Sequence, residues 1–482
     1  MNSSKERELF ENKPVLKAVF SLALPSVLAQ LLSVLYGLAD SFFIGMNHDD
    51  VMVAALNICL PAFLFLSAIS NLFGIGASSV LDRAFGEGKK EKARKTSAFA
   101  FYGALVSTLL YCLLAYFLRN PFLDLLGGKE ETLHQAAMPY FLLTVVLGGL
   151  PAMLSTLFSH LLRSQGRSLE ASLGVVLGGL LNVVLDPIFM FVCFPEREAV
   201  FAVGLATLVS NLATILYFVL VFLLRRKRLV LSFLPSKGMF GEKIPQQVLS
   251  AGTPAFLMTF CENVSFAVLD NLMSQVSLPA QAGLGIAKKI AMFAHCGVRG
   301  MAQGVLPLIA YNKASGNRKR MKEIVKVSLL GSVLMALLFL LLDEAAARPL
   351  VSLFLGENDS GSLDYGIRFL RILSLGAPFS AVAYTVISFF QAVGKGGESL
   401  FVALLRKGLL DIPMMYLLGL LQATYGPVIA TPVTDVLCSL VALFLFFRYL
   451  KKHGQNKGRF ASDPVPLSRG GSLATPDIKL KK

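Results

Sequence analysis

Residues 163–191 read RSQGRSLEASLGVVLGGLLNVVLDPIFMF, and this stretch decides the fold class. It begins with arginine, serine and glycine, a composition typical of a solvent-exposed turn. It then continues as an apolar run. About 20 helical residues cover the hydrocarbon core of a bilayer, so this run is long enough to cross a membrane. The stretch therefore predicts a transmembrane helix over residues 168–193.

Two polar residues lie inside this apolar run. Asn182 and Asp186 are four residues apart, so they share one face of the helix. Pro187 follows at once and removes a backbone hydrogen bond. An acid at the centre of a membrane helix costs on the order of 3 kcal/mol. We expect a functional reason for that cost, and transport of a proton, an ion or a drug is the leading one.

The composition of the whole chain is that of a polytopic membrane protein. Of its 482 residues, 55% are hydrophobic and 16% are charged, whereas about 25% are charged in a soluble protein. The mean hydropathy is +0.65. The net charge of +15 does not indicate a nucleic-acid partner, because the basic residues lie in short gaps between apolar runs, as the positive-inside rule requires.

The apolar runs predict an all-α protein with twelve transmembrane helices. Every second gap between them is basic, which places these gaps and both termini in the cytoplasm. We expect a multi-pass protein of the bacterial cell membrane. The predicted spans are 15–45, 51–81, 96–118, 136–160, 168–193, 200–224, 246–275, 281–311, 324–342, 365–391, 399–421 and 426–449.

The chain also contains an internal repeat. GIGASSVLDRAFGEGKKEKARK matches GVLPLIAYNKASGNRKRMKE, which aligns Gly88 with Gly316, and RSQG matches QAVG, which aligns Gly166 with Gly394. Both pairs are 228 residues apart. Two six-helix lobes of the same orientation imply a pseudo-two-fold axis along the membrane normal and a central cavity.

This repeat predicts the domain organisation of the chain. We expect a cytoplasmic N-terminus (1–14), an N-lobe (15–224), a cytoplasmic loop (225–245), a C-lobe (246–449) and a basic, disordered cytoplasmic tail (450–482).

Five motifs together resemble the multidrug and toxic compound extrusion (MATE) family, in particular its bacterial MepA-like branch. They are LADSFFIG, GASSVLDRAFGEGKKEKA, LLRSQGRSLEASLGVVLGGLLNVVLDPIF, GVRGMAQGVLPLIAYNKASGNRKRMKE and FFQAVGKGGESLFVALLRK. The resemblance implies export of bulky, often cationic organic compounds by alternating access, driven by inward proton or sodium flow. It assigns the first-helix acid to Asp40, the fifth-helix pair to Asn182 and Asp186, and the seventh-helix acid to Glu262. The tenth-helix acid of the NorM branch has no counterpart in PFSAVAYTVISFF, which favours protons and the N-lobe.

The candidate coupling residues are Asp40, Asp186 and Asn182. Tyr36 lies four residues before Asp40 on the same helix face, and Tyr140 of the fourth span is a further candidate contact. The first and fifth spans both run outwards, so we expect the two acids to meet in one cavity. Two acids in a low-dielectric cavity repel each other, which favours proton binding.

The C-lobe contains a second group of charges. Glu262 and Asp270 share a broad face of the seventh span and are candidate contacts for a cationic substrate or an ion. A structural role for Glu262 stays open. Lys288, Lys289 and Arg299 in the eighth span are the obvious partners of these acids. A salt-bridge network is favoured over ligand binding there, because buried charges usually pair.

No pattern indicates an enzyme, so we expect no catalytic residues, no metal and no cofactor other than the coupling ion. The nucleotide-binding pattern G-x-x-x-x-G-K-[ST] is absent, and the six cysteines lack metal-ligand spacing. The expected partners are small organic cations and the lipid bilayer, and the expected state is a monomer. Two alternative functions are a flippase for lipid-linked precursors, which needs a large cationic cavity, and a membrane enzyme or channel, which the paired lobes disfavour.

Overall fold

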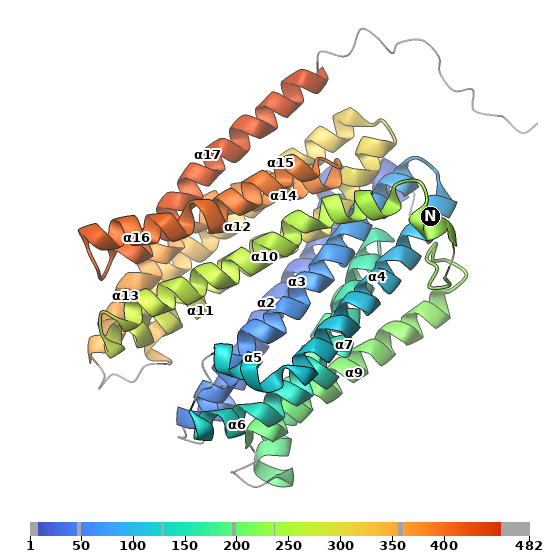
Figure 1. Ribbon diagram of the computed structural model, residues 1–482. Helices are drawn as coiled ribbons and strands as arrows, with labels where there is room; N and C mark the ends of the chain where they lie inside the picture. Colours follow the sequence, from blue (N-terminus) through green and yellow to red (C-terminus); the bar gives the residue numbers. More distant parts are fainter. Residues whose placement is uncertain are drawn as a thin grey trace, which may run out of the picture. The chain divides into compact units, whose positions relative to one another are not determined.

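The computed structural model describes residues 8–45, 50–126, 130–194, 199–235, 237–354 and 360–454 (Figure 1). Every regular element in these ranges is a helix. Residues up to Leu443 form one compact unit, and a second unit begins at Phe444. Of the predicted tail, only the first residues are described, as the end of the last helix at Gly454.

The first half of the compact unit, residues 8–225, is called the N-half below. Its described residues form eight α-helices, with a π-helical segment before the first of them and within the fourth and fifth predicted spans. The elements are η1 (Glu8–Asn12), α2 (Val15–Gly45), α3 (Asp50–Gly86), α4 (Lys90–Phe117), α5 (Arg119–Leu126), α6 (Glu131–Phe141), η2 (Leu142–Leu147), α7 (Gly149–Ser164), α8 (Ser168–Pro187), η3 (Ile188–Cys193) and α9 (Ala199–Arg225).

Residues 244–443 are called the C-half, and a short 3-10 turn, η5 (Lys237–Phe240), precedes them. The C-half elements are α10 (Ile244–Ser274), α11 (Leu278–Ala314), α12 (Arg318–Ser352), α13 (Ser360–Ser374), α14 (Ala377–Ala392), α15 (Gly396–Leu404), η6 (Leu405–Leu409), α16 (Asp411–Leu421) and the first part of α17 (Gly426–Gly454).

Each of the twelve predicted apolar runs is helical, and two runs match closely, since α2 covers 15–45 and α8 with η3 covers 168–193. Two runs are bent, by 45° between η2 and α7 and by 44° between α13 and α14. Within the described ranges, seven helices are long and apolar enough to cross a membrane, or nine if each bent pair counts as one span. Helices α10 and α11 and the α15–α16 stretch are not among them, and they contain most of the charged residues of the C-half described below.

Four glycines end helices in a left-handed conformation. Gly88, Gly166, Gly316 and Gly394 have φ values of 74°, 76°, 80° and 78°, and they are the residues that the repeat aligns. A residue with a Cβ atom pays roughly 1–2 kcal/mol in this conformation, so glycine is required at these turns.

One prediction about these turns is wrong. Residues 163–166 were expected to be solvent-exposed, but Arg163 is only 5% exposed and Gln165 only 3%. Packing against other segments is the physical reason. Arg163 lies against α3 and α11, and the N–H of Val230 donates to Oε1 of Gln165 at 3.0 Å. The ring of buried Phe10, in the N-terminal segment η1, lies 2.9 Å from the position that a Cβ of Gly166 would occupy. This segment therefore covers the turn between α7 and α8.

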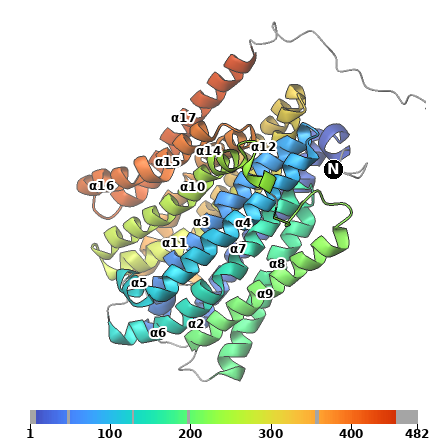
Figure 2. The ribbon, with the colours of Figure 1, turned by 45° about the vertical axis from the view of Figure 1, so that its right-hand side comes forward.

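The two halves meet along two helix pairs, α2 with α11 and α3 with α10 (Figures 1 and 2). Glycines bring these helices into backbone contact. A Cβ at Gly304 would lie 2.6 Å from the Cα of Ala23, and a Cβ at Gly76 would lie 2.3 Å from the carbonyl oxygen of Val248. Gly300 and Gly252 make similar approaches to α2 and α3. We call these four glycines the glycine seam.

Candidate functional site

The polar pair of α8 is buried and hydrogen-bonded. Asn182 is 6% exposed and Asp186 is fully buried, and the Nδ2 of Asn182 donates a hydrogen bond to Oδ1 of Asp186 at 3.0 Å. The opposite face of α8 consists of exposed apolar residues such as Leu177 and Leu180. The polar pair therefore faces the interior of the protein.

The helix changes its winding directly after this pair. Pro187 ends α8, and residues 188–193 continue as the π-helical segment η3. Pro187 lacks an N–H, so a backbone carbonyl one turn earlier loses its helical partner. Single π-helical turns occur frequently at functional sites. The span thus changes from α-helical to π-helical winding directly after Asp186, without a break.

The other N-lobe candidates are placed only in part. Tyr36 and Asp40 belong to α2, but their side chains lie outside the described part of the structure. Tyr140 of α6 is half-buried and packs in a cluster with Met190 of η3 and Val203 of α9. Tyr140 therefore packs against the segment that follows Asp186, and the meeting of Asp40 with Asp186 stays a prediction.

Glu262 of α10 lies in a hydrogen-bonded triad in the C-half. Nη2 of Arg299 donates to Oε2 of Glu262 at 2.6 Å, and the hydroxyl of Tyr384 donates to Oε1 at 3.0 Å. The same Nη2 donates to the Tyr384 hydroxyl at 3.1 Å. The guanidinium of Arg299 therefore neutralises Glu262, and α14 supplies the third member of the triad.

Asp270 does not join this triad, because it forms an ion pair with Lys288. The ammonium of Lys288 also lies 5.4 Å from the ring centroid of Phe266. The predicted pairing of eighth-span cations with acids of the seventh span is thus confirmed at two positions. Glu262 and Asp270 share a helix but bind different cations.

Sequence reasoning missed two buried cations in the eleventh predicted span. Arg406 is fully buried and Lys407 is 2% exposed. The Nε of Arg406 donates to Oδ1 of Asp435 at 2.7 Å, and the guanidinium lies 4.4 Å from the ring centroid of Tyr384. Nζ of Lys407 donates to Oδ2 of Asp411 at 2.9 Å.

Both cations lie in the π-helical segment η6, where Arg406 and Lys407 are buried side by side in the sequence. The hydroxyl of Ser265 on α10 donates to the same oxygen of Asp411 at 2.6 Å and completes the contact. The sequence did contain one indication of the Lys407–Asp411 ion pair, because the two residues lie four apart within an apolar run.

The C-half network contains matched charges. Three cations each have a carboxylate partner, Arg299 with Glu262, Arg406 with Asp435, and Lys407 with Asp411. Arg406 and Lys407 are buried, and Arg299 is partly buried. Removing one partner of a buried ion pair costs about 3–5 kcal/mol, because the other charge remains. Within the described ranges, no group of three or more His, Cys, Asp or Glu side chains is arranged to hold a metal ion.

Two relatives found by sequence comparison are multidrug export proteins. The multidrug export protein MepA of Staphylococcus aureus (strain MRSA252) is 27% identical over 441 residues, which cover 91% of this chain and 95% of that protein. MepA of Staphylococcus saprophyticus is 27% identical over 438 residues, with the same coverage.

Two solved structures share the fold. One is an outward-facing multidrug resistance MATE family transporter of the MOP superfamily, with a TM-score of 0.86 at 19% identity over 95% of this chain and 100% of that chain. The other is a MOP superfamily transporter from Pyrococcus furiosus, with a TM-score of 0.83 at 21% identity and the same coverage. The MatE family profile matches residues 25–188 and 254–417, which together make up more than half of the sequence. The chain therefore belongs to the MATE family of transporters.

Proposed function

We propose that this protein is a secondary active multidrug exporter that exchanges inward protons for outward bulky organic cations by alternating access. Sodium is the second candidate for the coupling ion. The names of the MepA relatives support multidrug export. The observation that carries the proposal is the fully buried Asp186 with its Asn182 donor, directly before the π-helical segment η3.

The coupling site would consist of Asp186, Asn182 and Asp40. Helix α2, which carries Asp40, packs against α8, which carries Asp186, so the two acids belong to neighbouring helices. Burial of a carboxylate favours its protonated form, and opening to the cytoplasm favours release. Asn182 would hold the carboxyl group in place in both states, and binding of a cationic substrate would compete with binding of the proton.

The proposed architecture has twelve membrane spans in two six-helix lobes, with both termini in the cytoplasm and a monomer as the working unit. The double match of one family profile supports the repeat, as do the four aligned glycines with the same backbone conformation. The close contact between Gly86 of α3 and Tyr311 of α11 lies near the basic loops. We infer that the halves touch at their cytoplasmic ends here and that transport separates them.

The charge distribution favours cations over a lipid-linked anionic precursor. A flippase for such a precursor would need a large cationic cavity, whereas the cations of the C-half triad and of η6 are paired with carboxylates and the pocket between the halves described below is small. Because Arg299 already neutralises Glu262, we assign cation binding to the N-half rather than to Glu262 or Asp270.

Efflux of ethidium from proteoliposomes tests this function. The purified full-length protein is reconstituted, and a proton gradient or a sodium gradient is imposed in separate vesicles of equal membrane potential. We expect efflux under the proton gradient alone. Efflux under the sodium gradient alone would change the coupling ion, and the absence of efflux of ethidium and other organic cations under both gradients would refute multidrug antiport.

A further inference from the structure

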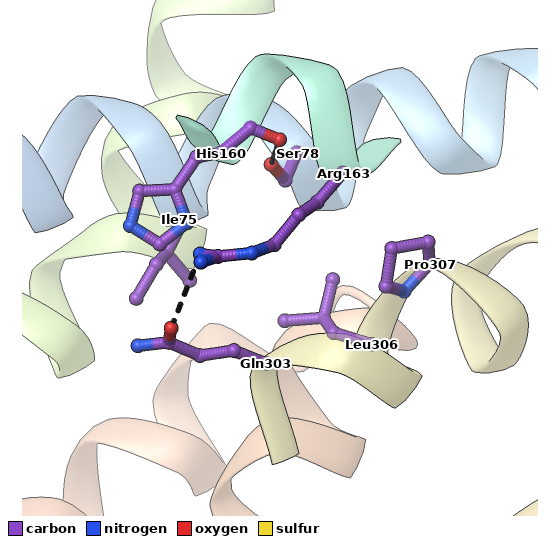
Figure 3. A pocket seen from close by; sticks show the side chains of 7 residues that line it. All are labelled: Ile75, Ser78, His160, Arg163, Gln303, Leu306 and Pro307. Atoms are coloured by element: carbon purple, nitrogen blue, oxygen red, sulfur yellow. Dashed lines mark hydrogen bonds between the residues drawn. The ribbon is translucent and has the colours of Figure 1, made fainter. Parts of the chain in front are cut away.

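A small pocket lies between the two halves, and none of the residues assigned to coupling lines it. Helices α3 and α7 of the N-half and α11 of the C-half form it (Figure 3). The free space at its centre is about the size of one water molecule. The lining residues are Ile75, Ser78, His160, Arg163, Gln303, Leu306 and Pro307.

The guanidinium of Arg163 dominates this pocket. Arg163 is 5% exposed, and its one protein hydrogen bond in the described ranges runs from Nη1 to Oε1 of Gln303, at a long 3.4 Å. Nε is buried and has no hydrogen-bond partner, and no carboxylate of the described residues forms an ion pair with this side chain. Arg163 thus differs from Arg299 and Arg406, which both face a carboxylate.

The neighbouring side chains do not supply the missing negative charge. Oε1 of Gln303 is shared with a second donor, the Nε2 of Gln30 at 3.3 Å. The hydroxyl of Ser78 donates to the backbone oxygen of His160 at 3.0 Å. In Figure 3 the imidazole of His160 and the amide of Gln303 both point towards the guanidinium. All the lining side chains are neutral or basic.

The helix end offers only partial compensation. Arg163 lies in the last turn of α7, where the helix dipole provides the equivalent of about half a negative charge. A buried guanidinium needs a counter-charge with good hydrogen-bond geometry. The guanidinium fork, with an orphan Nε and a weakly used Nη1, is therefore oriented for an acceptor that the protein does not provide.

We propose that this pocket is a binding site for a monatomic anion, chloride under physiological conditions, with Arg163 as its principal ligand. The size of the free space selects a monatomic ion over a larger oxyanion. Neutral His160 and the amide of Gln303 can add hydrogen bonds, as can a water molecule.

Chloride binding would be linked to the conformation of the transporter. The pocket exists only while α11 of the C-half lies against α3 and α7 of the N-half, because Gln303 belongs to α11 and Arg163 to α7. A ligand that binds one conformation better than another shifts the population towards it. Chloride should therefore favour the arrangement in which the glycine seam is closed.

A chloride titration of the thermal unfolding temperature tests the site. The purified full-length protein is measured at constant ionic strength while sodium gluconate is replaced by sodium chloride. We expect a saturable rise of the unfolding temperature in the native protein and its loss in Arg163→Gln. Arg167→Gln is the matched control, because Arg167 already pairs with Glu170 at 2.9 Å, and it should keep the chloride response.

Two further measurements keep the test decisive if Arg163→Gln does not fold. Crystals of the native protein grown in bromide should show anomalous density within hydrogen-bond distance of the Arg163 guanidinium. Arg163→Lys keeps the charge and should keep a chloride response with weaker apparent affinity. An unfolding temperature that is equal in chloride and gluconate, an equal chloride response in Arg163→Gln, or bromide density absent from this pocket would each overturn the proposal.

Discussion

Replacing Gly252 by alanine should separate α3 from α10. A Cβ at this position would lie 1.8 Å from the carbonyl oxygen of Leu72 and 2.7 Å from its carbonyl carbon. Both obstacles are backbone atoms, so no side-chain rotation can relieve the clash. Ordinary contact with a Cβ begins at 3.4 Å, and the two helices must therefore move apart locally by about 1.6 Å.

The size of the effect follows from this clash. Overpacking of a well-packed interior costs about 1–3 kcal/mol. A cost of about 2 kcal/mol corresponds to a change of roughly 30-fold in an equilibrium constant. Because the cost applies only while the seam is closed, Gly252→Ala should shift the population towards the arrangement with separated halves by about this factor.

Cysteine crosslinking across the seam measures this shift. Nδ2 of Asn71 on α3 donates to Oγ1 of Thr259 on α10 at 3.1 Å, so cysteines at these two positions, in a variant without the six native cysteines, should crosslink readily. Gly252→Ala should slow the reaction at least tenfold. Gly285→Ala is the matched control, since a Cβ there meets no atom within 4 Å. Equal crosslinking rates in both variants would refute the role of the glycine seam.

Three further changes have defined outcomes. Arg299→Gln leaves Glu262 buried without its cation and should lower the free energy of unfolding by about 3 kcal/mol. Adding Glu262→Gln should recover most of this loss in the same unfolding assay, and no recovery would contradict the pairing. Arg320→Ala removes hydrogen bonds to backbone carbonyls of η1 and should therefore speed cleavage by Glu-C protease after Glu11. Unchanged cleavage would show that these hydrogen bonds do not hold η1 in place. Gly394→Ala, at a φ of 78°, should cost about 1 kcal/mol of unfolding free energy, whereas no change would mean that the turn relaxes.

Most of the helices were predictable from the sequence, because long apolar runs define them. The bends were not. The run 136–160 shows no interruption in hydropathy, yet η2 ends at a break before α7, where the N–H of Gly148 donates to the carbonyl of Leu143. A π-helical turn differs from an α-helical turn by one residue, and hydrophobic periodicity does not resolve that difference over so short a segment.

Contacts within one helix were easier to predict than contacts between helices. The Asn182–Asp186 hydrogen bond follows from a spacing of four residues. Arg406 pairs with Asp435 on another helix, and no sequence pattern links two residues on different helices. Arg163 was assigned to an exposed turn by its neighbours in the sequence, and its burial depends on packing against α3 and α11.

Proton-driven efflux by the Asp186→Asn variant tests the central claim most directly. The variant keeps the size of the side chain and a polar partner for Asn182, but it cannot carry a proton. Asp124→Asn serves as the control, because the Asp124 side chain is 51% exposed. In proteoliposomes with equal protein content, we predict that Asp186→Asn lowers proton-driven ethidium efflux to the rate of empty vesicles while Asp124→Asn remains near native. Native efflux by Asp186→Asn would contradict the proposed coupling site.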